Sequence, residues 1–182
     1  MTPREPSNHS PFFDSLVTID IGNTQTSVAG FEGAEVKTCQ QFSSKHLTNK
    51  RELTDFCTRC RPLIDAAPVV AMSSVVPKIA TKLKAIFLEQ FGEKVIFEVS
   101  HQKKLPFEIC YQTPETLGND RLALCAAAAE QFPNQAVIVI DFGTAITYDI
   151  LSSKNKYLGG LILAGTSLSA RALHEHTAQL PN

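Results

Sequence analysis

Two short segments share one pattern, and this pattern constrains the fold more than any other feature of the chain. "TIDIGNTQTSV" (18–28) and "VIDFGTAITYD" (139–149) each hold an apolar strand that ends in Asp, an apolar residue and Gly. A polar turn and a second strand follow in both, so that Asp20 and Asp141 occupy equivalent positions. A repeat at this level predicts two units that each open with a β-hairpin and face each other across a cleft.

The first half of the chain alternates between strand-like and helix-like patterns. Strands are expected at 16–21, 24–31, 35–42, 68–73 and 94–99, and helices at 49–65, 77–91 and 118–131. Thr48 is a candidate cap for the 49–65 helix, and Pro77 suits the first turn of the next one. Three strands followed by alternating helices and strands predict an α/β sheet with helices packed against it.

The second half starts in the same way and then stops. Strands are expected at 136–142, 144–151 and 156–163, followed by a helix at about 167–177. Completing this copy would take roughly 55 more residues, from usual strand, helix and loop lengths. We therefore expect an N-terminal domain at 16–133 after a disordered extension at 1–15, and a partial C-terminal domain at 134–182. The partial sheet should leave strand edges and an apolar face uncovered.

Composition excludes several classes of protein. The 182 residues include 43% apolar and 19% charged ones, with a formal net charge of -1 and scattered Lys and Arg, so no nucleic-acid partner is expected. No apolar run approaches the roughly 20 residues that span a bilayer, and the N-terminus lacks the apolar core of a secretory signal. Five cysteines, an odd number, favour reduced thiols in a cytoplasmic protein.

Cys57 and Cys60 have the CxxC spacing of redox and zinc sites. They fall at helical spacing with three other apolar residues, which are Leu53, Phe56 and Ile64. Both thiols should therefore point into the core, and no second CxxC or CxxH pair follows. Structural cysteines are favoured over a metal or redox role.

The two Asp-Gly turns suggest a nucleotide site. Gly after a strand-end Asp lets the backbone approach a ligand closely, and successive turn N–H groups can form an anion-binding concavity. Asn23, Thr24 and Thr144 add side-chain donors. The carboxylates of Asp20 and Asp141 would repel phosphate unless cations sit between them, as in a nucleotide bound with Mg²⁺.

A third constellation is "YQTPETLGNDRLAL", residues 111–124. Asp120 at the start of a helix can accept a proton from, or orient, an attacking hydroxyl. Arg121 could bind a substrate carboxylate through paired hydrogen bonds. Taken alone, the segment favours the simpler interpretation, a helix-starting Asp followed by a surface Arg.

These motifs together resemble type III pantothenate kinases. The matching segments are "DIGNTQTSVAGF" (20–31), "SSVVP" (73–77), "YQTPETLGNDR" (111–121), "DFGTAITYDI" (141–150), "GGLILAG" (159–165) and "LHEHTAQLP" (173–181). The resemblance runs from about Leu16 to the last residue. It implies two ribonuclease H-like domains of the actin-like ATPase and sugar-kinase superfamily, the second ending here after three strands and one helix. It also implies transfer of the ATP γ-phosphate to pantothenate, the first step towards coenzyme A.

The resemblance also assigns roles by position. Asp120 would be the proton acceptor, and Asp141 the ligand of a monovalent cation, K⁺ or NH₄⁺. ATP phosphates would be bound by Thr144 and by the first turn, which comprises Asp20, Ile21, Gly22, Asn23, Thr24, Gln25, Thr26 and Ser27. Pantothenate would be bound by Tyr111, Gly118, Asn119, Asp120, Arg121 and Thr177. The family is typically homodimeric.

The chain departs from the family pattern at Thr113, where Asn is usual, and at Ala164, where Pro is usual. A chain without the remaining half-domain is expected to have low activity.

Two other functions fit the same residues less well. One is a regulatory relative similar to the Bvg accessory factor, against which the acidic residues Asp20, Asp120 and Asp141 argue. The other is a different small-molecule kinase of the superfamily, such as a sugar kinase, against which "LGNDR" argues.

Overall fold

The computed structural model describes residues 15–177, in two compact units that meet in sequence at Glu98 and Val99. The sequence places the boundary later, after residue 133. The difference has a physical reason, because the segment between the two positions packs inside the second unit. There β6 (Glu108–Ile109) pairs with β9 (Lys156–Ala164), and α3 (Asn119–Gln131) lies against β7 (Val137–Phe142) and β8 (Ala145–Leu151). The extension expected at 1–15 lies outside the described residues except for Ser15, which begins a strand.

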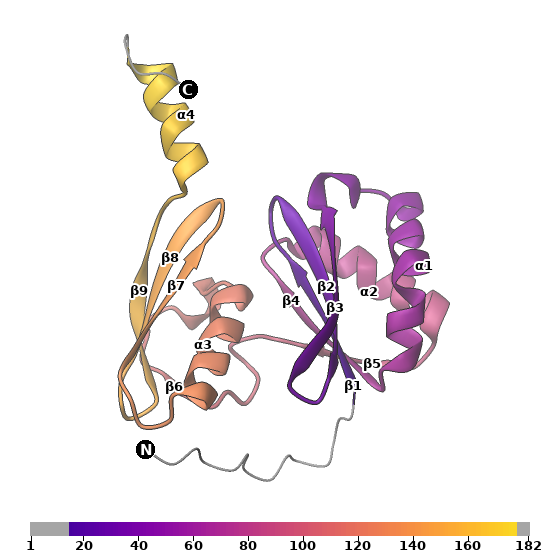
Figure 1. Cartoon of the computed structure of the whole chain (residues 1–182), viewed down its shortest axis with the longest axis horizontal. Helices are drawn as coiled ribbons and strands as arrows, with labels where there is room; N and C mark the ends of the chain where they lie inside the picture. The colour runs from indigo at the N-terminus through magenta and orange to yellow at the C-terminus, as the bar shows by residue number, and fades with distance from the viewer. Residues whose placement is uncertain (1–14, 178–182) are drawn as a thin grey trace. The chain divides into compact units, whose positions relative to one another are not determined.

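The first unit is a five-stranded sheet with two helices (Figure 1). β1 (Ser15–Ile21), β2 (Gln25–Glu32) and β3 (Glu35–Ser43) form an antiparallel meander. β4 (Val69–Ser74) and β5 (Val95–Glu98) add in parallel beyond β1, joined through α1 (Lys50–Ala66) and α2 (Pro77–Phe91). The strand order of this sheet is β3-β2-β1-β4-β5. The predicted α/β class is confirmed.

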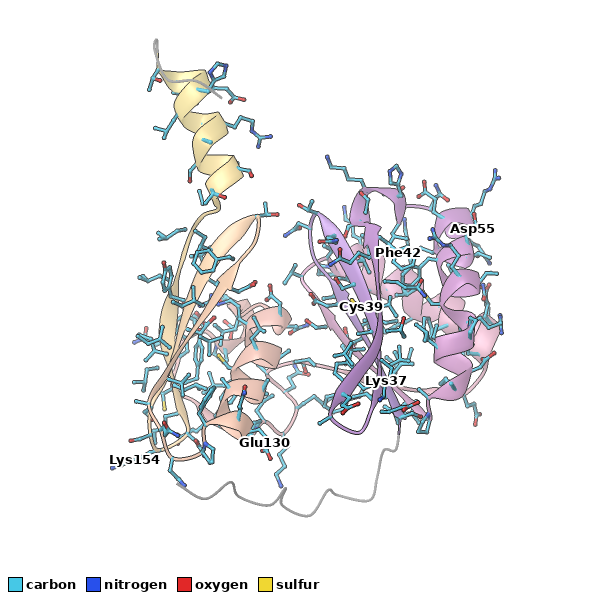
Figure 2. The ribbon with its side chains drawn as sticks, in the orientation of Figure 1. Lys37, Cys39, Phe42, Asp55, Glu130 and Lys154 are labelled. Atoms are coloured by element: carbon cyan, nitrogen blue, oxygen red, sulfur yellow. The ribbon has the colours of Figure 1, made fainter. Side chains whose placement is uncertain are left out.

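The core of this unit forms where apolar stripes of the helices meet alternate residues of the strands. Val17, Ile19 and Ile21 of β1 are buried together with one face of each helix. Those faces are Leu53, Phe56, Cys57, Cys60 and Ile64 on α1, and Ile79, Leu83, Ile86 and Phe87 on α2. Phe42 of β3, labelled in Figure 2, packs edge-on against Phe56 with ring centroids 4.8 Å apart. The predicted core role of the two CxxC cysteines is confirmed.

The cap of α1 differs from the prediction by one residue. Asn49, not Thr48, is the N-cap, and its side chain accepts a hydrogen bond from the backbone N–H of Glu52. The Glu52 carboxylate accepts in return from the backbone N–H groups of Thr48 and Asn49. This reciprocal capping box satisfies the backbone N–H groups of Asn49 and Glu52. Thr48 lies just outside the helix and adds a second N–H donor to the Glu52 carboxylate.

The second unit is a four-stranded sheet with order β6-β9-β8-β7. β7, β8 and β9 form the antiparallel meander predicted for the second copy, and β6 is an addition that the sequence did not predict. Leu122, Cys125, Ala128 and Ala129 of α3 are buried with Leu151 and Tyr157 of the sheet. α4 (Thr166–His176) begins just after β9 ends and extends away from the end of the sheet (Figure 1).

One face of the second sheet is uncovered among the described residues, as predicted. Ile138, Ile140 and Phe142 alternate with the partly buried Val137 and Val139, and Phe142 is 71% exposed. Aligning Asp141 with Asp20 places these three residues where β1 has the buried Val17, Ile19 and Ile21. In the first unit α1 and α2 contribute to the core that buries that face. α4 follows β9 as α1 follows β3, yet it has no buried residue.

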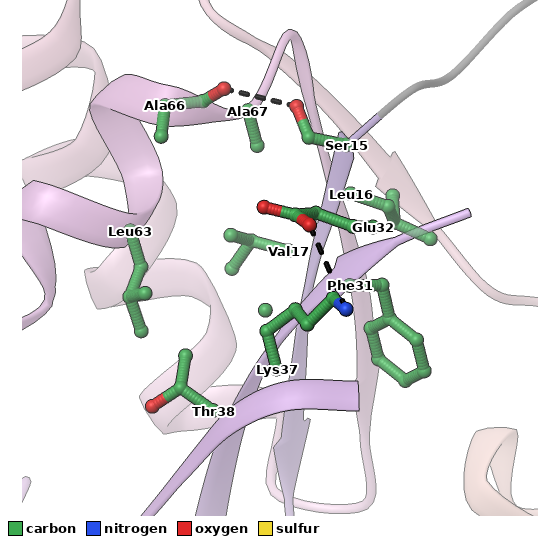
Figure 3. A pocket seen from close by; sticks show the side chains of 11 residues that line it. Ser15, Leu16, Val17, Phe31, Glu32, Lys37, Thr38, Leu63, Ala66 and Ala67 are labelled. Carbon is green, nitrogen blue, oxygen red and sulfur yellow. Dashed lines mark hydrogen bonds and ion pairs between the residues drawn. The ribbon is translucent and has the colours of Figure 1, made fainter. Parts of the chain in front are cut away.

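A small cavity of about 100 Å³ lies in the first unit, between the start of β1 and the end of α1 (Figure 3). Its lining includes Leu16, Val17 and Leu63, and the hydroxyl of Ser15 on its wall donates to the Ala66 carbonyl. Figure 3 also shows Lys37 and Glu32 side by side, with Nζ and Oε2 3.7 Å apart. None of the site residues predicted from the sequence lines this cavity.

The five free cysteines divide into two reactivity classes. Burial raises the pKa of Cys57 to about 12, of Cys60 to about 11 and of Cys125 to about 12, while Cys39 and Cys110 are exposed. The thiolate is the reactive form, so the buried thiols should stay protonated and inert between pH 7 and pH 9. We expect iodoacetamide to alkylate Cys39 and Cys110 in the native protein and all five thiols in denaturant, counted by mass spectrometry. Rapid native labelling of Cys57 or Cys60 would contradict their core placement.

Within the described part of the chain, none of the helices has the length and apolar character needed to span a membrane.

Candidate functional site

The first Asp-Gly turn joins β1 to β2 and is braced by a residue from elsewhere in the sequence. The Gly22 N–H donates to the Gln25 carbonyl at 2.9 Å, which closes the turn. The hydroxyl of Ser44 donates to the Gly22 carbonyl at 2.7 Å and lies 2.9 Å from the hydroxyl oxygen of Thr26. The Ser44 N–H donates to the Thr24 carbonyl at 2.9 Å. Ser44 therefore holds the turn in one conformation from the end of β3.

The predicted phosphate-binding residues of this turn differ in what they present to solvent. Asn23, Thr24 and Gln25 are exposed. The side chain of Ile21 lies fully buried in the core, and the Thr26 hydroxyl is paired inside the turn. Any contribution of Ile21 or Thr26 to ligand binding is thus left to their backbone groups.

Asp20 is exposed at the end of β1 between two serines. It lies opposite Ser27 on β2 and opposite Ser73 on β4. The Ser73 hydroxyl oxygen is buried and has no hydrogen-bond partner within the described residues. Carboxylate and hydroxyl oxygens are ligands that hard cations such as Mg²⁺ accept. The oxygen atoms around Asp20 are therefore of the kind that a hard cation binds.

The second Asp-Gly turn repeats this design in the second unit. The Gly143 N–H donates to the Ala145 carbonyl, and the Gly165 N–H donates to the Thr144 carbonyl, both at 2.9 Å. A Cβ on Gly165 would lie 2.2 Å from the Gly143 carbonyl oxygen, so only glycine lets the end of β9 approach the turn this closely. Asp141 is exposed opposite Thr147, whose buried hydroxyl has no hydrogen-bond partner in the described part of the chain. These oxygens fit the predicted cation ligand role of Asp141.

Asp120 lies in the first turn of α3, which starts after Gly118. Its carboxylate is half-buried and accepts a hydrogen bond of 2.7 Å from the Arg121 N–H. The N-terminal end of a helix interacts favourably with negative charge, which suits a carboxylate at this position.

Arg121 is buried, which contradicts its interpretation as a surface residue. Its Nε and Nη2 atoms donate to Asp149 Oδ1 at 2.9 and 2.7 Å, and Nη2 also donates to the Tyr157 hydroxyl at 3.1 Å. The Tyr157 hydroxyl in turn donates to Asp149 Oδ1 at 2.7 Å. Burial opposes the charge on Arg121, but the hydrogen bonds and negative charge of Asp149 outweigh it and raise the pKa of Arg121. The guanidinium is therefore charged and fixed in orientation.

Tyr111 joins this group through Tyr157. The two rings meet edge-on, with centroids 6.4 Å apart. The structure thus brings Tyr111, Asp120 and Arg121 together in the second unit, along with Gly118 and Asn119 at the start of α3. Thr177 is placed apart from them, because it follows α4 and its hydroxyl donates to the Leu173 carbonyl of the same helix.

Sequence reasoning missed Ser44, Asp149 and Tyr157. A signal was present for Asp149, because a carboxylate inside the apolar strand "AITYDIL" needs a buried partner. For Ser44 and Tyr157 the signal was absent, since both act through contacts with residues far away in the sequence.

Comparison with known proteins identifies the family. The family model for type III pantothenate kinase matches residues 16–182. The chain belongs to the type III pantothenate kinase family. A type III pantothenate kinase of Chlorobaculum tepidum is 36% identical over 165 residues, which cover 91% of this chain and 61% of the relative. One from Legionella pneumophila is 38% identical over 173 residues, covering 92% of this chain and 66% of the relative. The chain therefore spans less than two thirds of the length of these curated family members.

The fold comparison agrees with the family assignment. The crystal structure of an Aquifex aeolicus Ppx/GppA phosphatase matches with a TM-score of 0.52 at 12% sequence identity, covering 91% of this chain and 56% of that one. A second Aquifex aeolicus Ppx/GppA structure matches with a TM-score of 0.51 at 14% identity. At these identities the likeness concerns the fold alone, and it supports the two-unit architecture predicted for a type III pantothenate kinase.

Proposed function

We propose that this chain transfers the γ-phosphate of ATP to the primary hydroxyl of pantothenate. The observation that carries the proposal is the grouping of Tyr111, Asp120 and Arg121 around the start of α3, in a chain of the type III pantothenate kinase family. A carboxylate that can accept a proton lies next to a fixed cation that can bind the carboxylate of pantothenate. Tyr111, which is 39% exposed, contributes an aromatic ring to the same group.

In this proposal Asp120 accepts the proton of the pantothenate hydroxyl as that hydroxyl attacks the γ-phosphate. The same carboxylate orients the hydroxyl for this attack. Arg121 binds the carboxylate end of the substrate and thereby fixes the distance between that end and Asp120. Gly118 and Asn119 contribute backbone groups, and Thr177 a hydroxyl.

The residues that we propose for ATP binding lie in the two Asp-Gly turns. Asp20 to Ser27 and Thr144 supply backbone and side-chain donors for phosphate oxygens. Bound Mg²⁺ would neutralise charge on the phosphates beside Asp20, and a monovalent cation, K⁺ or NH₄⁺, would be held by Asp141. The unpaired thiols suit a cytoplasmic location, and a homodimer stays a prediction from the resemblance.

A substrate panel tests this function. The purified chain is incubated with ATP and Mg²⁺ in KCl or NH₄Cl, alone and with pantothenate or glucose, and the phosphorylated products are detected by mass spectrometry. We expect a product from pantothenate only. Phosphorylation of glucose in place of pantothenate would support the sugar-kinase alternative and overturn the proposal.

A further inference from the structure

The guanidinium of Arg121 is held by one of its edges. Nε and Nη2 both donate to the carboxylate of Asp149, and Nη2 donates to Tyr157 as well. The Tyr157 hydroxyl donates to Asp149, so the three side chains form a closed ring of hydrogen bonds. Asp149 and Tyr157 are fully buried. A planar guanidinium bound in this way has one orientation, and Nη1 takes no part in the ring.

The backbone of β9 makes room for this ring at Gly160. A Cβ at this position would lie 2.5 Å from Arg121 Nη2 and 3.0 Å from Asp149 Oδ1. It would also lie 2.0 Å from the carbonyl oxygen of Tyr148, which cannot move away without breaking the β8–β9 pairing. The Arg121–Asp149 ion pair therefore packs directly against the backbone of Gly160. A side chain at position 160 would displace the ion pair.

Stability alone is a weak reason to bury these charges. Replacing a buried ion pair by apolar residues of similar volume is often neutral or stabilising, because desolvation offsets the attraction between the charges. Here Arg121 of the pair follows directly after Asp120 in the chain, and both members of the pair contact Tyr157, against which Tyr111 packs. The ion pair is therefore connected to Asp120 and to Tyr111, two of the side chains predicted to bind the substrate.

We propose that Asp149 and Tyr157 are positioning residues that orient Arg121 so that Nη1 meets the carboxylate of pantothenate. This inference rests on the proposed function. Asp149 fixes the guanidinium plane through two nitrogens, and Tyr157 links that plane to the ring of Tyr111. Neither residue needs to touch the substrate, so both act through Arg121.

A double-mutant cycle tests this linkage, with pantothenate affinity measured by calorimetry. Asp149→Asn should weaken pantothenate binding at least about tenfold, because it removes the charge that orients Arg121. Tyr157→Phe keeps the ring and should weaken binding about threefold to fivefold. Arg121→Gln should weaken it strongly. The double variant Arg121→Gln with Asp149→Asn should then bind no more weakly than Arg121→Gln alone, since Asp149 has lost the residue through which it acts.

Two controls separate positioning from general damage. Tyr148→Phe makes the same chemical change on the neighbouring strand outside the ring and should leave pantothenate affinity unchanged. Affinity for a non-hydrolysable ATP analogue should change less than about twofold in every variant, since sites without shared partners act independently. If Asp149→Asn does not fold, the double variant leaves no unpaired buried charge and Tyr157→Phe leaves the ion pair intact, so both remain measurable.

The outcomes distinguish the inference from the function on which it rests. If the unaltered chain binds pantothenate and Tyr157→Phe and Asp149→Asn bind it equally well, the positioning role is wrong and the proposed function stands. Additive losses in the double variant, or equal losses for the ATP analogue, would also overturn the positioning role. If the unaltered chain does not bind pantothenate, the proposed function fails and the inference fails with it.

Discussion

Replacing Asp120 with Asn is expected to reduce phosphate transfer to pantothenate by a factor of about 10² to 10⁴, the usual contribution of a positioned general base. The amide has nearly the same shape as the carboxylate, and its oxygen can still accept the 2.7 Å hydrogen bond from the Arg121 N–H. The start of α3 should therefore be retained. What is lost is the negative charge that accepts a proton from the attacking hydroxyl.

The rate of ADP release that depends on pantothenate, followed in a coupled assay, measures this loss. Binding of pantothenate and of an ATP analogue should change far less than the rate, because Arg121 and the two Asp-Gly turns are untouched. Asp55→Asn is a matched control, since Asp55 is exposed on α1 in the first unit, where Figure 2 labels it. An Asp120→Asn protein whose rate stays within about threefold of the original would remove Asp120 from the role of proton acceptor.

Local patterns predicted the elements well because each depends on neighbouring residues. The stripe of Leu53, Phe56 and Ile64 has helical spacing, and all three are buried on α1. The apolar run in "VIVIDF" predicted β7, and the repeat of the Asp-Gly turn predicted that a meander follows in both units. The error at the cap of α1 is of the same local kind, since Thr48 and Asn49 are adjacent and both can cap a helix.

Contacts between distant residues could not be predicted in this way. The sequence assigned α3 to the first domain because the helix follows β5, but the burial of Leu122 and Cys125 against Tyr157 places it in the second unit. Arg121 was compatible with a surface position because nothing nearby in the chain pairs with it. Its partner Asp149 lies 28 residues further along and its second partner Tyr157 lies 36 residues further along.

The two sheets also show that one pattern can have two outcomes. Ile19 and Ile140 occupy equivalent positions before an Asp, yet Ile19 is buried and Ile140 is 46% exposed. The residues themselves do not differ in hydrophobicity. The difference is in the helices that cover each sheet. Residues of α1 and α2 are buried in the same core as Ile19, whereas α4 has no buried residue.

Replacing Gly160 with Ala is expected to destabilise the second unit by about 3–5 kcal/mol, the range for breaking a buried ion pair. The added methyl group would overlap the Tyr148 carbonyl oxygen and Arg121 Nη2, at 2.0 and 2.5 Å. The carbonyl belongs to the sheet and cannot retreat, so β9 must shift or the guanidinium must leave Asp149. In either case buried charges lose their partners.

The distribution of tyrosines makes this loss directly measurable. The chain has three tyrosines and no tryptophan, and Tyr111, Tyr148 and Tyr157 all lie in the second unit. Near-ultraviolet circular dichroism of tyrosine during urea unfolding therefore follows that unit, and its midpoint should fall sharply in Gly160→Ala. Gly30→Ala is the matched control, because a Cβ there meets side-chain atoms of Thr38 and Leu63 at 3.1 and 3.4 Å, which can yield. Its tyrosine transition should be unchanged. A Gly160→Ala protein with the original midpoint would mean that β9 does not need bare backbone beneath the Arg121–Asp149 pair.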